Sequence, residues 1–538
     1  MIELSDDLSY PGDQEEAERG PSHALAKIYG QAVNGLSATT ITIEAQCQDG
    51  VRYTLVGLPD TAVKESRERV EAALLESGIA WKRRRYIINM SPADIRKEGA
   101  AYDLPLAVVL AGLMCPLDLS PLEHVVVMGE LSLDGQIQPI HGILPMAINA
   151  VREGFRAIIV PRANAREAAV VNGLTVYAAD TLTQVLAFVS GTGTLDVVTD
   201  HTSESDFVTS IDSMLDFADV KGQEEVRRAM EVAAAGNHNI LMVGAPGSGK
   251  SMMAKRLPAI LPPLTKEEAI ETTMIHSVAG VLPPDSGLMT QRPFRSPHHT
   301  TSGVALVGGG TYPKPGEISL AHNGVLFLDE LPEFSRHVLE VLRQPLEDRI
   351  VTVSRARGTI TFPASFMLVA SMNPCPCGNY NNPAKDCTCL PGQISAYLGR
   401  LSGPLLDRID IQVEIVPVPF EALSSREPGE SSAEIRERVL RARAIQSARY
   451  RDIPGIYTNA QMTPALMKEY IRIDSAGREL LRRAMDHYGL SARAYDRILK
   501  VSRTIADLEG SPEVLTHHIG EAVNYRKLDR SSWGEVKS

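Results

Sequence analysis

A glycine-rich loop between an apolar strand and a helix is the clearest chemical feature of this 538-residue sequence. The strand is predicted over 240–243, and the helix opens at Lys250 and Ser251. Glycines let backbone N–H groups close around phosphate oxygens, and the helix N-terminus adds a partial positive charge. We therefore expect ATP to bind here, with Lys250 on its β- and γ-phosphates and the Ser251 hydroxyl on Mg²⁺. The predicted loop comprises Gly244, Ala245, Pro246, Gly247, Ser248, Gly249, Lys250 and Ser251.

An acidic pair at the end of a second apolar strand suits the same site. Residues 325–328 are all apolar, as in a parallel strand that is buried on both faces, and Asp329 and Glu330 follow them. We expect Asp329 to hold Mg²⁺, directly or through water, and Glu330 to polarise the attacking water.

Three polar residues further along the chain complete the expected ATP chemistry. Asn373 ends a third apolar strand, where its side chain can orient water beside the γ-phosphate. Arg408 and Arg493 each suit the stabilisation of charge on the transferring phosphoryl group. The predicted catalytic set is therefore Glu330, Asn373, Arg408 and Arg493.

Four of the six cysteines form two C-x-C pairs that are separated by nine residues. Cys375, Cys377, Cys387 and Cys389 can supply four thiolates to one tetrahedral Zn²⁺, so we expect a structural zinc in an insertion at 375–389. An iron–sulfur cluster and free or redox-active thiols are the alternatives. No open ligand position is indicated, so the expected metal is not catalytic.

A basic hairpin is predicted between the acidic pair and Asn373. Two β-forming runs flank the sequence SRARG, which places Arg355 and Arg357 at the tip and Arg349 at the base. Clustered arginines at an exposed tip suit contacts with DNA phosphates. The segment 292–310 is a second candidate loop of this kind, through Arg295, His298 and His299, and its two histidines are also weaker candidates for zinc.

The length and composition of the chain limit the domain organisation that can hold these residues in place. The chain has a net charge of −12, with 44% apolar and 22% charged residues, as in a folded protein of several domains. We expect an acidic tail over 1–22, a mixed α/β domain over 23–190, a linker over 191–213, a P-loop α/β core over 214–422 and a helical domain over 423–538. Helix starts are predicted at Ser431, which has capping-box spacing to Glu434, and at Thr463, Ser491 and Ser511.

The sequence has no apolar run of about 18 residues, and its first residues are acidic rather than basic and then apolar. We therefore expect no membrane span and no signal peptide, and a cytoplasmic location. Because the net charge is negative, any DNA contact has to be a local patch.

The order of the nucleotide motifs resembles the magnesium-chelatase-like AAA+ ATPases of the ComM/YifB type, over about residues 23–527. On this resemblance, 244–251 is Walker A, 325–330 is Walker B, Asn373 is sensor 1, Arg408 is the arginine finger and Arg493 is sensor 2. The resemblance implies ATP-driven rings, mostly hexamers, with sites between subunits, so that Arg408 would act on a neighbour's nucleotide. The core is also similar to that of the MCM helicases, in which a hairpin at this position enters the ring pore and grips DNA.

The first α/β domain resembles the Lon-type protease domain, which uses a Ser–Lys dyad. The position that matches the serine is Ala101, and the position that matches the lysine is Leu144 or Met146. Because both catalytic groups are missing, we expect a catalytically inactive domain that serves assembly or substrate engagement. The run 82–85, Lys-Arg-Arg-Arg, is a further candidate DNA contact, or an exposed basic face.

The leading interpretation is a ring-forming AAA+ ATPase that moves on branched or single-stranded DNA. The resemblance implies that it acts in branch migration during homologous recombination and natural transformation. One alternative is a chelatase-type motor that assists metal insertion into a tetrapyrrole. Another is an ATPase that remodels proteins or regulates transcription.

Overall fold

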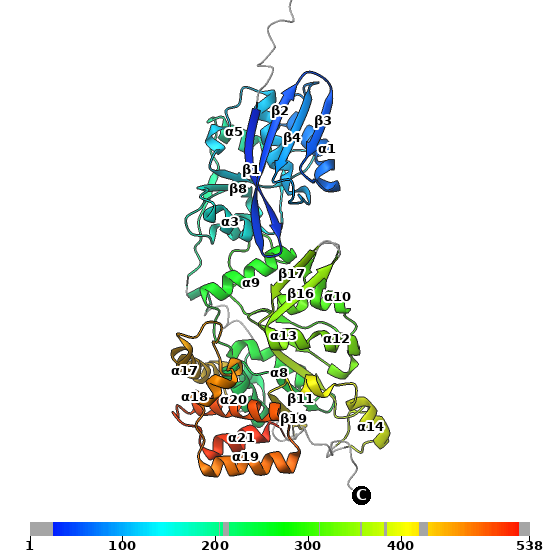
Figure 1. Ribbon diagram of the computed structural model, residues 1–538, viewed down its shortest axis with the longest axis vertical. Helices are drawn as coiled ribbons and strands as arrows, with labels where there is room; N and C mark the ends of the chain where they lie inside the picture. The colour runs from blue at the N-terminus through cyan, green and yellow to red at the C-terminus, as the bar shows by residue number, and fades with distance from the viewer. Residues whose placement is uncertain are drawn as a thin grey trace, which may run out of the picture. The chain divides into compact units, whose positions relative to one another are not determined.

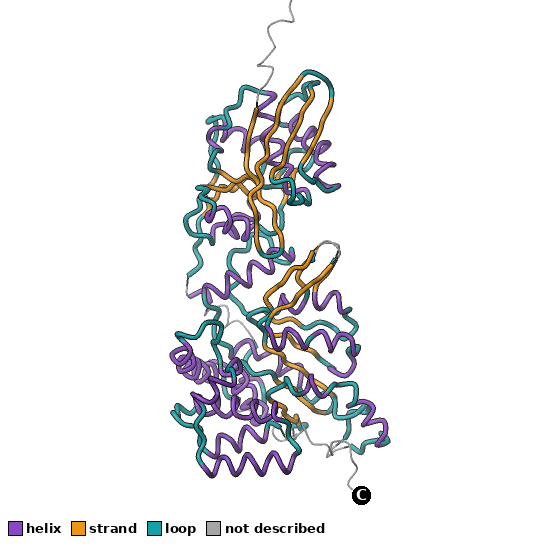
Figure 2. Tube along the Cα trace, in the orientation of Figure 1, coloured by secondary structure: helices purple, strands orange, loops and turns teal. Residues whose placement is uncertain are grey.

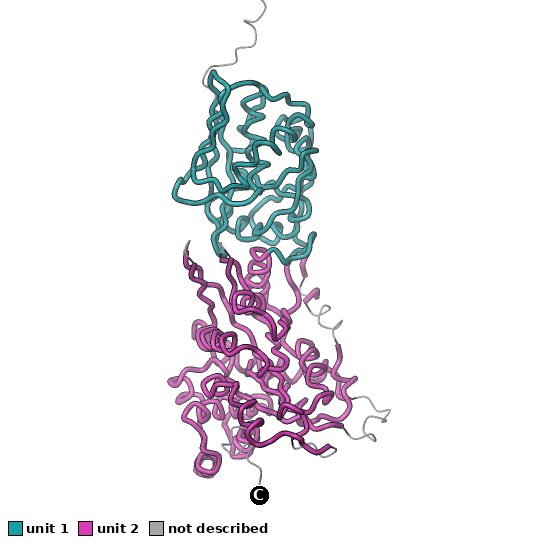
Figure 3. The backbone as a smooth tube through the Cα atoms, turned by 90° about the vertical axis from the view of Figure 1, so that its right-hand side faces the viewer, with its two compact units in different colours: residues 1–201, 280–287 teal, residues 202–279, 288–538 magenta. Residues whose placement is uncertain are grey.

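The computed structural model describes residues 25–203, 205–207, 215–310, 313–355, 358–380, 385–418 and 429–526. The chain divides into two compact units, one of residues 1–201 with 280–287 and one of residues 202–279 with 288–538 (Figure 3). The predicted acidic tail lies outside the described residues. So does 419–428, which contains the predicted boundary between core and helical domain, and that boundary stays a prediction.

The first unit is built on an eight-stranded mixed sheet in the order β10-β9-β8-β5-β1-β2-β4-β3. Its centre is a long antiparallel pair, β1 and β2, whose turn contains Gly35 with φ of +62°. The two strands alternate buried and more exposed residues, which is typical of a sheet with one face on a core. The strands are β1 (Leu25–Asn34), β2 (Ser37–Gln48), β3 (Arg52–Val56), β4 (Arg85–Ser91), β5 (Val125–Val127), β8 (Ala157–Pro161), β9 (Thr175–Ala179) and β10 (Asp196–Val198).

The helices of the first unit have local signals at their ends. In α1 the Asp60 side chain accepts a hydrogen bond from the N–H of Val63 at 2.8 Å, and Gly78, with φ of +84°, follows the helix end. The apolar helix α2 is buried over most of its length. The helices are α1 (Thr61–Glu76), α2 (Asp103–Met114), α3 (Ile143–Arg152), α4 (Arg162–Ala169) and α5 (Leu182–Val189), with a short hairpin of β6 (Glu130–Leu131) and β7 (Ile137–Gln138).

Part of the predicted linker 191–213 belongs to this sheet. Residues 196–198 form β10, which pairs antiparallel with β9. Leu195 is buried, and the guanidinium of Arg162 lies 2.7 Å from the Asp196 carboxylate. The expectation of a segment without a core was therefore wrong for these residues, because one apolar anchor and one ion pair suffice to add an edge strand.

The second unit has a five-stranded parallel sheet in the order β12-β15-β18-β11-β19. Parallel strands present their carboxyl ends at one edge, so the loops after β11, β15 and β18 converge there. The strands are β11 (Ile240–Gly244), β12 (Phe294–Arg295), β15 (Val325–Leu328), β18 (Met367–Met372) and β19 (Ile411–Ile415). The associated helices are α7 (Glu224–Gly236), α8 (Lys250–Arg256), α9 (Lys266–Ala279), α10 (Gly303–Val307), α11 (Glu317–Leu320), α12 (Arg336–Val341), α13 (Arg343–Asp348), α14 (Pro391–Leu398) and α15 (Gly403–Leu406).

The predicted basic hairpin is confirmed as an antiparallel pair, β16 (Ile350–Arg355) and β17 (Gly358–Pro363). Figures 1 and 2 show that the two strands extend away from the five-stranded sheet of their unit. Residues 356 and 357, which connect the two strands, lie outside the described residues. A second short pair, β13 (Gly308–Gly309) and β14 (Lys314–Pro315), belongs to the same unit.

The residues after 429 form helices, as expected, and these pack together in Figure 1. Predicted caps are confirmed at Ser431, which forms a capping box with Glu434, and at Thr463 and Ser491. The helices are α17 (Ser432–Tyr450), α18 (Pro464–Tyr470), α19 (Ser475–Tyr488), α20 (Ala492–Leu508) and α21 (Thr516–Asn524). With parallel and mixed sheets in two units and helices at the end, the predicted α/β fold class is confirmed.

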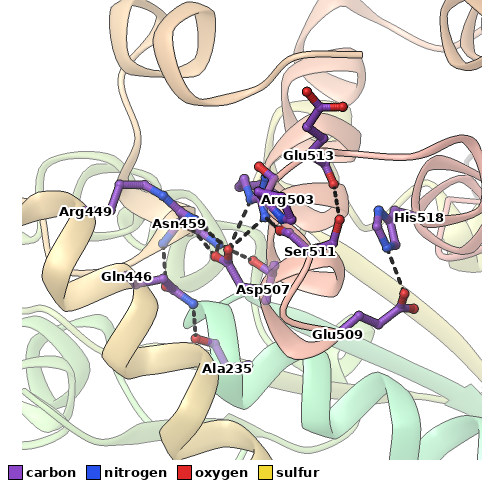
Figure 4. Close-up of polar contacts among 12 residues, drawn as sticks. Ala235, Gln446, Arg449, Asn459, Arg503, Asp507, Glu509, Ser511, Glu513 and His518 are labelled. Atoms are coloured by element: carbon purple, nitrogen blue, oxygen red, sulfur yellow. Dashed lines mark hydrogen bonds and ion pairs between the residues drawn. The ribbon is translucent and has the colours of Figure 1, made fainter. Parts of the chain in front are cut away.

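A buried polar cluster joins these helices to α7 (Figure 4). The Asp507 carboxylate accepts hydrogen bonds from Arg449 at 2.8 Å and from the Asn459 amide at 2.7 Å. Gln446 accepts from the backbone N–H of Asn459 at 2.9 Å and donates to the carbonyl of Ala235 at 3.0 Å. Each buried polar group finds a partner on another element, which fixes how the helices pack.

The predicted helix start at Ser511 was wrong, because α21 begins at Thr516. The guanidinium of Arg503 donates to the carbonyls of Ser511 and Pro512. Those two carbonyls are thus held by a side chain of α20 rather than by helical N–H groups. The capping pattern of the sequence could not reveal this partner.

Candidate nucleotide site and cysteine cluster

The glycine-rich loop lies between β11 and α8, where the sequence predicted it. Gly247 and Gly249 have φ of +77° and +97°, a conformation that favours glycine. The Lys250 ammonium donates to the carbonyls of Gly244 at 2.7 Å and Ala245 at 2.9 Å. Burial lowers the pKa of Lys250, while Asp329 and Glu330 oppose this shift. A phosphate group would replace the carbonyls as the partner of this ammonium.

Asp329 is held by two hydroxyl groups, one from a helix and one from a strand. Ser251 Oγ donates to Asp329 Oδ2 at 2.7 Å, and Ser371 Oγ donates to Oδ1. Ser251 opens α8 and Ser371 lies on β18, so the carboxylate is fixed from both sides. This is the arrangement expected of a Mg²⁺ site that uses the Ser251 hydroxyl and the Asp329 carboxylate, oxygen ligands which Mg²⁺ prefers.

Glu330 has a half-exposed side chain and a strained backbone, with φ of +54°. Its carboxylate lies 3.7 Å from Nδ1 of His299, whose ring packs against His298 with centroids 4.1 Å apart. The structure therefore places His299 beside the predicted water-polarising group. Arg295 forms two 2.7 Å hydrogen bonds with Glu317, and the second DNA loop at 292–310 stays a prediction.

Asn373 lies at the end of β18 and accepts a hydrogen bond from Lys250 Nζ at 3.1 Å. The structure thus brings Lys250, Asp329 and Asn373 together from three different elements. Their roles in hydrolysis stay predictions, and the geometry supports them.

The two predicted catalytic arginines are placed differently. The Arg408 side chain is only 9% exposed, and its guanidinium contacts Glu347 and donates to the Pro404 carbonyl at 2.7 Å. The Arg493 side chain is 60% exposed and lies 3.8 Å from Asp407. In this single chain Arg408 therefore does not project from the surface, as a group that acts on a neighbour's nucleotide must.

The hairpin arginines differ in exposure. Arg355 is exposed at the tip, where its guanidinium donates to the Ser354 carbonyl at 2.9 Å, and Arg357 lies outside the described residues. Arg349 lies at the base, as predicted, where burial lowers its pKa to about 10. It remains cationic at neutral pH, but Arg355 is the better placed of the two for an extended ligand.

The four clustered cysteines converge. Their Sγ atoms lie within 4.8 Å of one another, with separations of 3.4 Å for Cys375 to Cys377, 3.7 Å for Cys375 to Cys387 and 3.6 Å for Cys377 to Cys387. A tetrahedral ion with Zn–S bonds of about 2.3 Å needs S–S separations of about 3.8 Å. Backbone N–H groups of Cys377 and Tyr380 point at the sulfurs of Cys389 and Cys375, each at 3.3 Å, as suits thiolates.

A second group of possible metal ligands, Glu509, His517 and His518, does not have suitable chemistry. Nδ1 of His518 accepts the backbone N–H of Leu515 at 2.9 Å, so the neutral ring carries its proton on Nε2. That Nε2 donates to Glu509 at 3.0 Å and has no lone pair for a metal. The hydrogen bonds of this group link the end of α20 to α21.

The positions that match the Lon-type dyad carry no nucleophile or base. Ala101 lies in a single 3₁₀ turn, and its carbonyl accepts the N–H of Gly129 at 2.9 Å. Leu144 and Met146 are buried in α3. The side chain of Lys97 is also buried, and it donates to the carbonyls of Pro92 and Ile95, which is a structural use.

Sequence reasoning missed Ser371 and Glu347. A hydroxyl residue within the otherwise apolar strand 367–372, two residues before Asn373, was the available signal for Ser371. Nothing comparable identifies Glu347, because its contact with Arg408 spans 61 positions.

Comparisons with known proteins cover nearly all of the chain. Family models match residues 43–164 (subunit ChlI of Mg-chelatase), 216–423 (magnesium chelatase, subunit ChlI) and 429–526 (magnesium chelatase, subunit ChlI C-terminal). The competence protein ComM of Haemophilus influenzae is 44% identical over 94% of this chain and 98% of its own.

Two further relatives extend the comparison. YifB of Escherichia coli is 42% identical over the same shares of the two chains. The magnesium-chelatase 38 kDa subunit of Cereibacter sphaeroides is 25% identical over 42% of this chain and 72% of its own. No helix in the described part of the chain is long and apolar enough to cross a membrane. With its phosphate-binding loop, its parallel sheet and relatives that match it almost end to end, the chain belongs to the ComM/YifB family of magnesium-chelatase-like AAA+ ATPases.

Proposed function

We propose that the chain forms a homohexameric ring that couples ATP hydrolysis to movement on DNA. In this proposal it acts as a branch-migration helicase in homologous recombination and natural transformation. The observation that carries the proposal is the position of the basic hairpin β16–β17, which is inserted between β15 and β18 of the ATPase sheet. Along the chain, the hairpin therefore follows Asp329 and precedes Asn373.

The residues of the site suggest how hydrolysis proceeds. Ser251 and Asp329 would hold Mg²⁺, which supplies charge neutralisation to the β- and γ-phosphates. Lys250 binds the same phosphates, while Glu330 takes up the proton of the attacking water and Asn373 orients that water. Arg408 of one chain and Arg493 stabilise the charge that develops on the transferring group.

The similarity to the competence protein ComM supports the proposed role in natural transformation, because that relative matches 94% of the chain. We also propose that the chain assembles with copies of itself, because an arginine finger acts on the nucleotide of a neighbouring subunit. The DNA substrate is branched or single-stranded, and the contacts are Arg349, Arg355 and Arg357.

We also propose that Cys375, Cys377, Cys387 and Cys389 hold a structural Zn²⁺. The convergence of the four sulfurs within 4.8 Å of one another supports it, and no side chain outside this set is needed. Elemental analysis of protein purified without chelators should find one zinc per chain. Iron with a visible charge-transfer absorption would support the iron–sulfur alternative, and the absence of both metals would leave free thiols.

The first unit is proposed to be a Lon-like domain without proteolytic activity, over 23–190, with the ATPase core over 214–422 and a helical lid over 423–538. Ala101, Leu144 and Met146 offer no hydroxyl or amine for peptide-bond cleavage. Incubation with casein and ATP should give no cleavage products. ATP-dependent cleavage that persists after removal of contaminating proteases would contradict this proposal.

A single experiment tests the motor. The ATPase rate of the assembled protein is measured with and without a labelled four-way junction, and strand displacement is followed on the same junction. We expect DNA to raise the rate and ATP to drive displacement, and the Lys250→Ala variant to do neither. An assembled ring that hydrolyses ATP, is not stimulated by any DNA and moves no strand would refute the DNA motor and favour the chelatase or remodelling alternatives.

A further inference from the structure

The four-cysteine cluster lies directly against the phosphate-binding loop. Gly378 follows Cys377, and a Cβ atom at Gly378 would lie 2.3 Å from Cδ and 2.7 Å from Cγ of Pro246. Gly378 has φ of +79°, and its N–H donates to the Cys375 carbonyl at 3.0 Å. The backbone at Gly378 therefore packs on the ring of Pro246, in a contact that only glycine permits.

The segment that carries the first cysteine pair touches the phosphate site at a second point. Asn373 accepts a hydrogen bond from Lys250 at 3.1 Å, two positions before Cys375. Cys375 is fully buried and Cys377 is partly buried. Residues 373–378 thus contact the phosphate site at both ends, and two of the proposed metal ligands lie between these contacts.

The second cysteine pair, Cys387 and Cys389, lies against the first pair and can tie it in place. Cys387 and Cys389 reach the first pair across a loop whose residues 381–384 lie outside the described residues. A metal ion would join the two pairs by four strong bonds, whereas the thiols alone make only weak contacts with one another. The shape of 373–378 would therefore depend on whether the ion is bound.

We propose that the four-cysteine loop is a metal-dependent brace for the phosphate-binding loop, so that occupancy by Zn²⁺ sets the affinity for nucleotide. The proposal rests on the zinc site proposed above and adds a role to it. Gly378 is the positioning residue that transmits the brace to Pro246, and Asn373 transmits it to Lys250.

The test measures zinc content and the dissociation constant for Mg·ADP on the full-length protein, by elemental analysis and calorimetry. In the Cys387→Ser/Cys389→Ser variant we expect zinc to be lost and ADP to bind about tenfold more weakly, the scale of one lost charge-assisted hydrogen bond. In Gly378→Ala we expect zinc to be retained and ADP affinity to fall by a similar factor, because the new methyl group displaces Pro246.

Gly392→Ala is the matched control, since no atom lies within 4 Å of a Cβ at that position, three residues beyond Cys389. It should leave both quantities unchanged. A wild-type protein without zinc overturns the metal site itself. If the wild type contains zinc but the affinity for ADP is unchanged in the zinc-free cysteine variant or in Gly378→Ala, the proposed brace is overturned. The metal would then stabilise only its own loop.

Discussion

Ser371 shows how a buried hydroxyl can determine the behaviour of a metal ligand. Its side chain is fully buried on β18 and donates to Asp329, whose other oxygen accepts from Ser251. In the proposed Mg²⁺ site Ser251 would serve as a ligand, and Ser371 would be the group that orients the Asp329 carboxylate. Outer hydrogen bonds of this kind fix ligand geometry and tune metal affinity.

We therefore predict that Ser371→Ala raises the Mg²⁺ concentration needed for half-maximal ATPase activity by about tenfold, with little effect on folding. The measurement is a Mg²⁺ titration of the ATPase rate at saturating ATP. Ser66→Ala is the control, because Ser66 is equally buried in the first unit, where its hydroxyl donates to the Val63 carbonyl. An unchanged Mg²⁺ requirement in Ser371→Ala would remove the orienting role.

At this scale, sequence patterns located the residues that share a local motif, and the structure supplied their partners. The motif Gly244–Ser251 and the Asp329–Glu330 pair lie where the strand and helix signals put them. The contacts of Ser371 and Glu347 depend on strand order and on elements far apart in sequence, which periodicity does not encode. Arg357 lies outside the described residues, so its place at the hairpin tip stays a prediction.

The hairpin β16–β17 is the element whose function is simplest to test. Its tip carries Arg355 in an exposed position, and Arg357 is its predicted companion. Changing both to Ala should lower the slope of log affinity for DNA against log salt by about 2, because each phosphate contact contributes about 0.9. Fluorescence anisotropy with a labelled junction at several salt concentrations measures this slope.

The control for the hairpin is Arg451→Ala together with Arg472→Ala, which removes the same charge from the helical region. We expect the slope to change by less than half as much in this variant. Equal slopes in both double variants would indicate diffuse electrostatic attraction rather than a hairpin contact.

Helix α20 carries a lysine, Lys500, whose surroundings disfavour its charged form. Lys500 donates to the Ala460 carbonyl at 3.1 Å, and burial together with Arg497 lowers its pKa to about 8. In the unfolded chain its pKa is near 10.4. Between these two values only the unfolded state keeps the proton, so folding becomes more favourable as pH rises from about 8 to 10.

We predict that the free energy of unfolding of the wild type rises by about 2 kcal/mol relative to Lys500→Met between pH 7 and pH 10. Urea unfolding at both pH values gives this difference. Lys468→Met removes an exposed lysine of α18 and should show no such change with pH. A constant difference between wild type and Lys500→Met would mean that Lys500 keeps its ordinary pKa when folded.

At the element scale the sequence predicted most helices and strands because capping residues, glycines and apolar periods act locally. The capping box at Ser431 and the two strands of the hairpin are confirmed examples. The errors at Ser511 and at 196–198 have one cause: a side chain from another element, Arg503 or Arg162, supplies the decisive contact.

At the scale of the whole molecule, the buried position of Arg408 raises the question of how a ring would use it. The Glu347 carboxylate is 62% exposed and contacts the Arg408 guanidinium, and this contact lowers the pKa of Glu347. In a ring, the γ-phosphate of a neighbour would have to compete with Glu347 for Arg408, so assembly and the exchange of partners are linked.

This competition gives the final prediction, which concerns two chains rather than one. Arg408→Ala should bind ATP and fail to hydrolyse it, and Glu330→Gln should fail as well, because each lacks one half of a shared site. Mixed rings contain interfaces at which an intact Glu330 site faces an intact Arg408, so mixing the two variants should restore part of the ATPase rate, with a maximum near equal amounts. If Arg408 instead serves the nucleotide of its own chain, every site in the mixture lacks one group and no activity returns. Adding Glu347→Gln to the Glu330→Gln partner should then raise the restored rate, since its Arg408 is released from the intrachain pair, whereas Glu333→Gln, which frees Arg400 instead, should not.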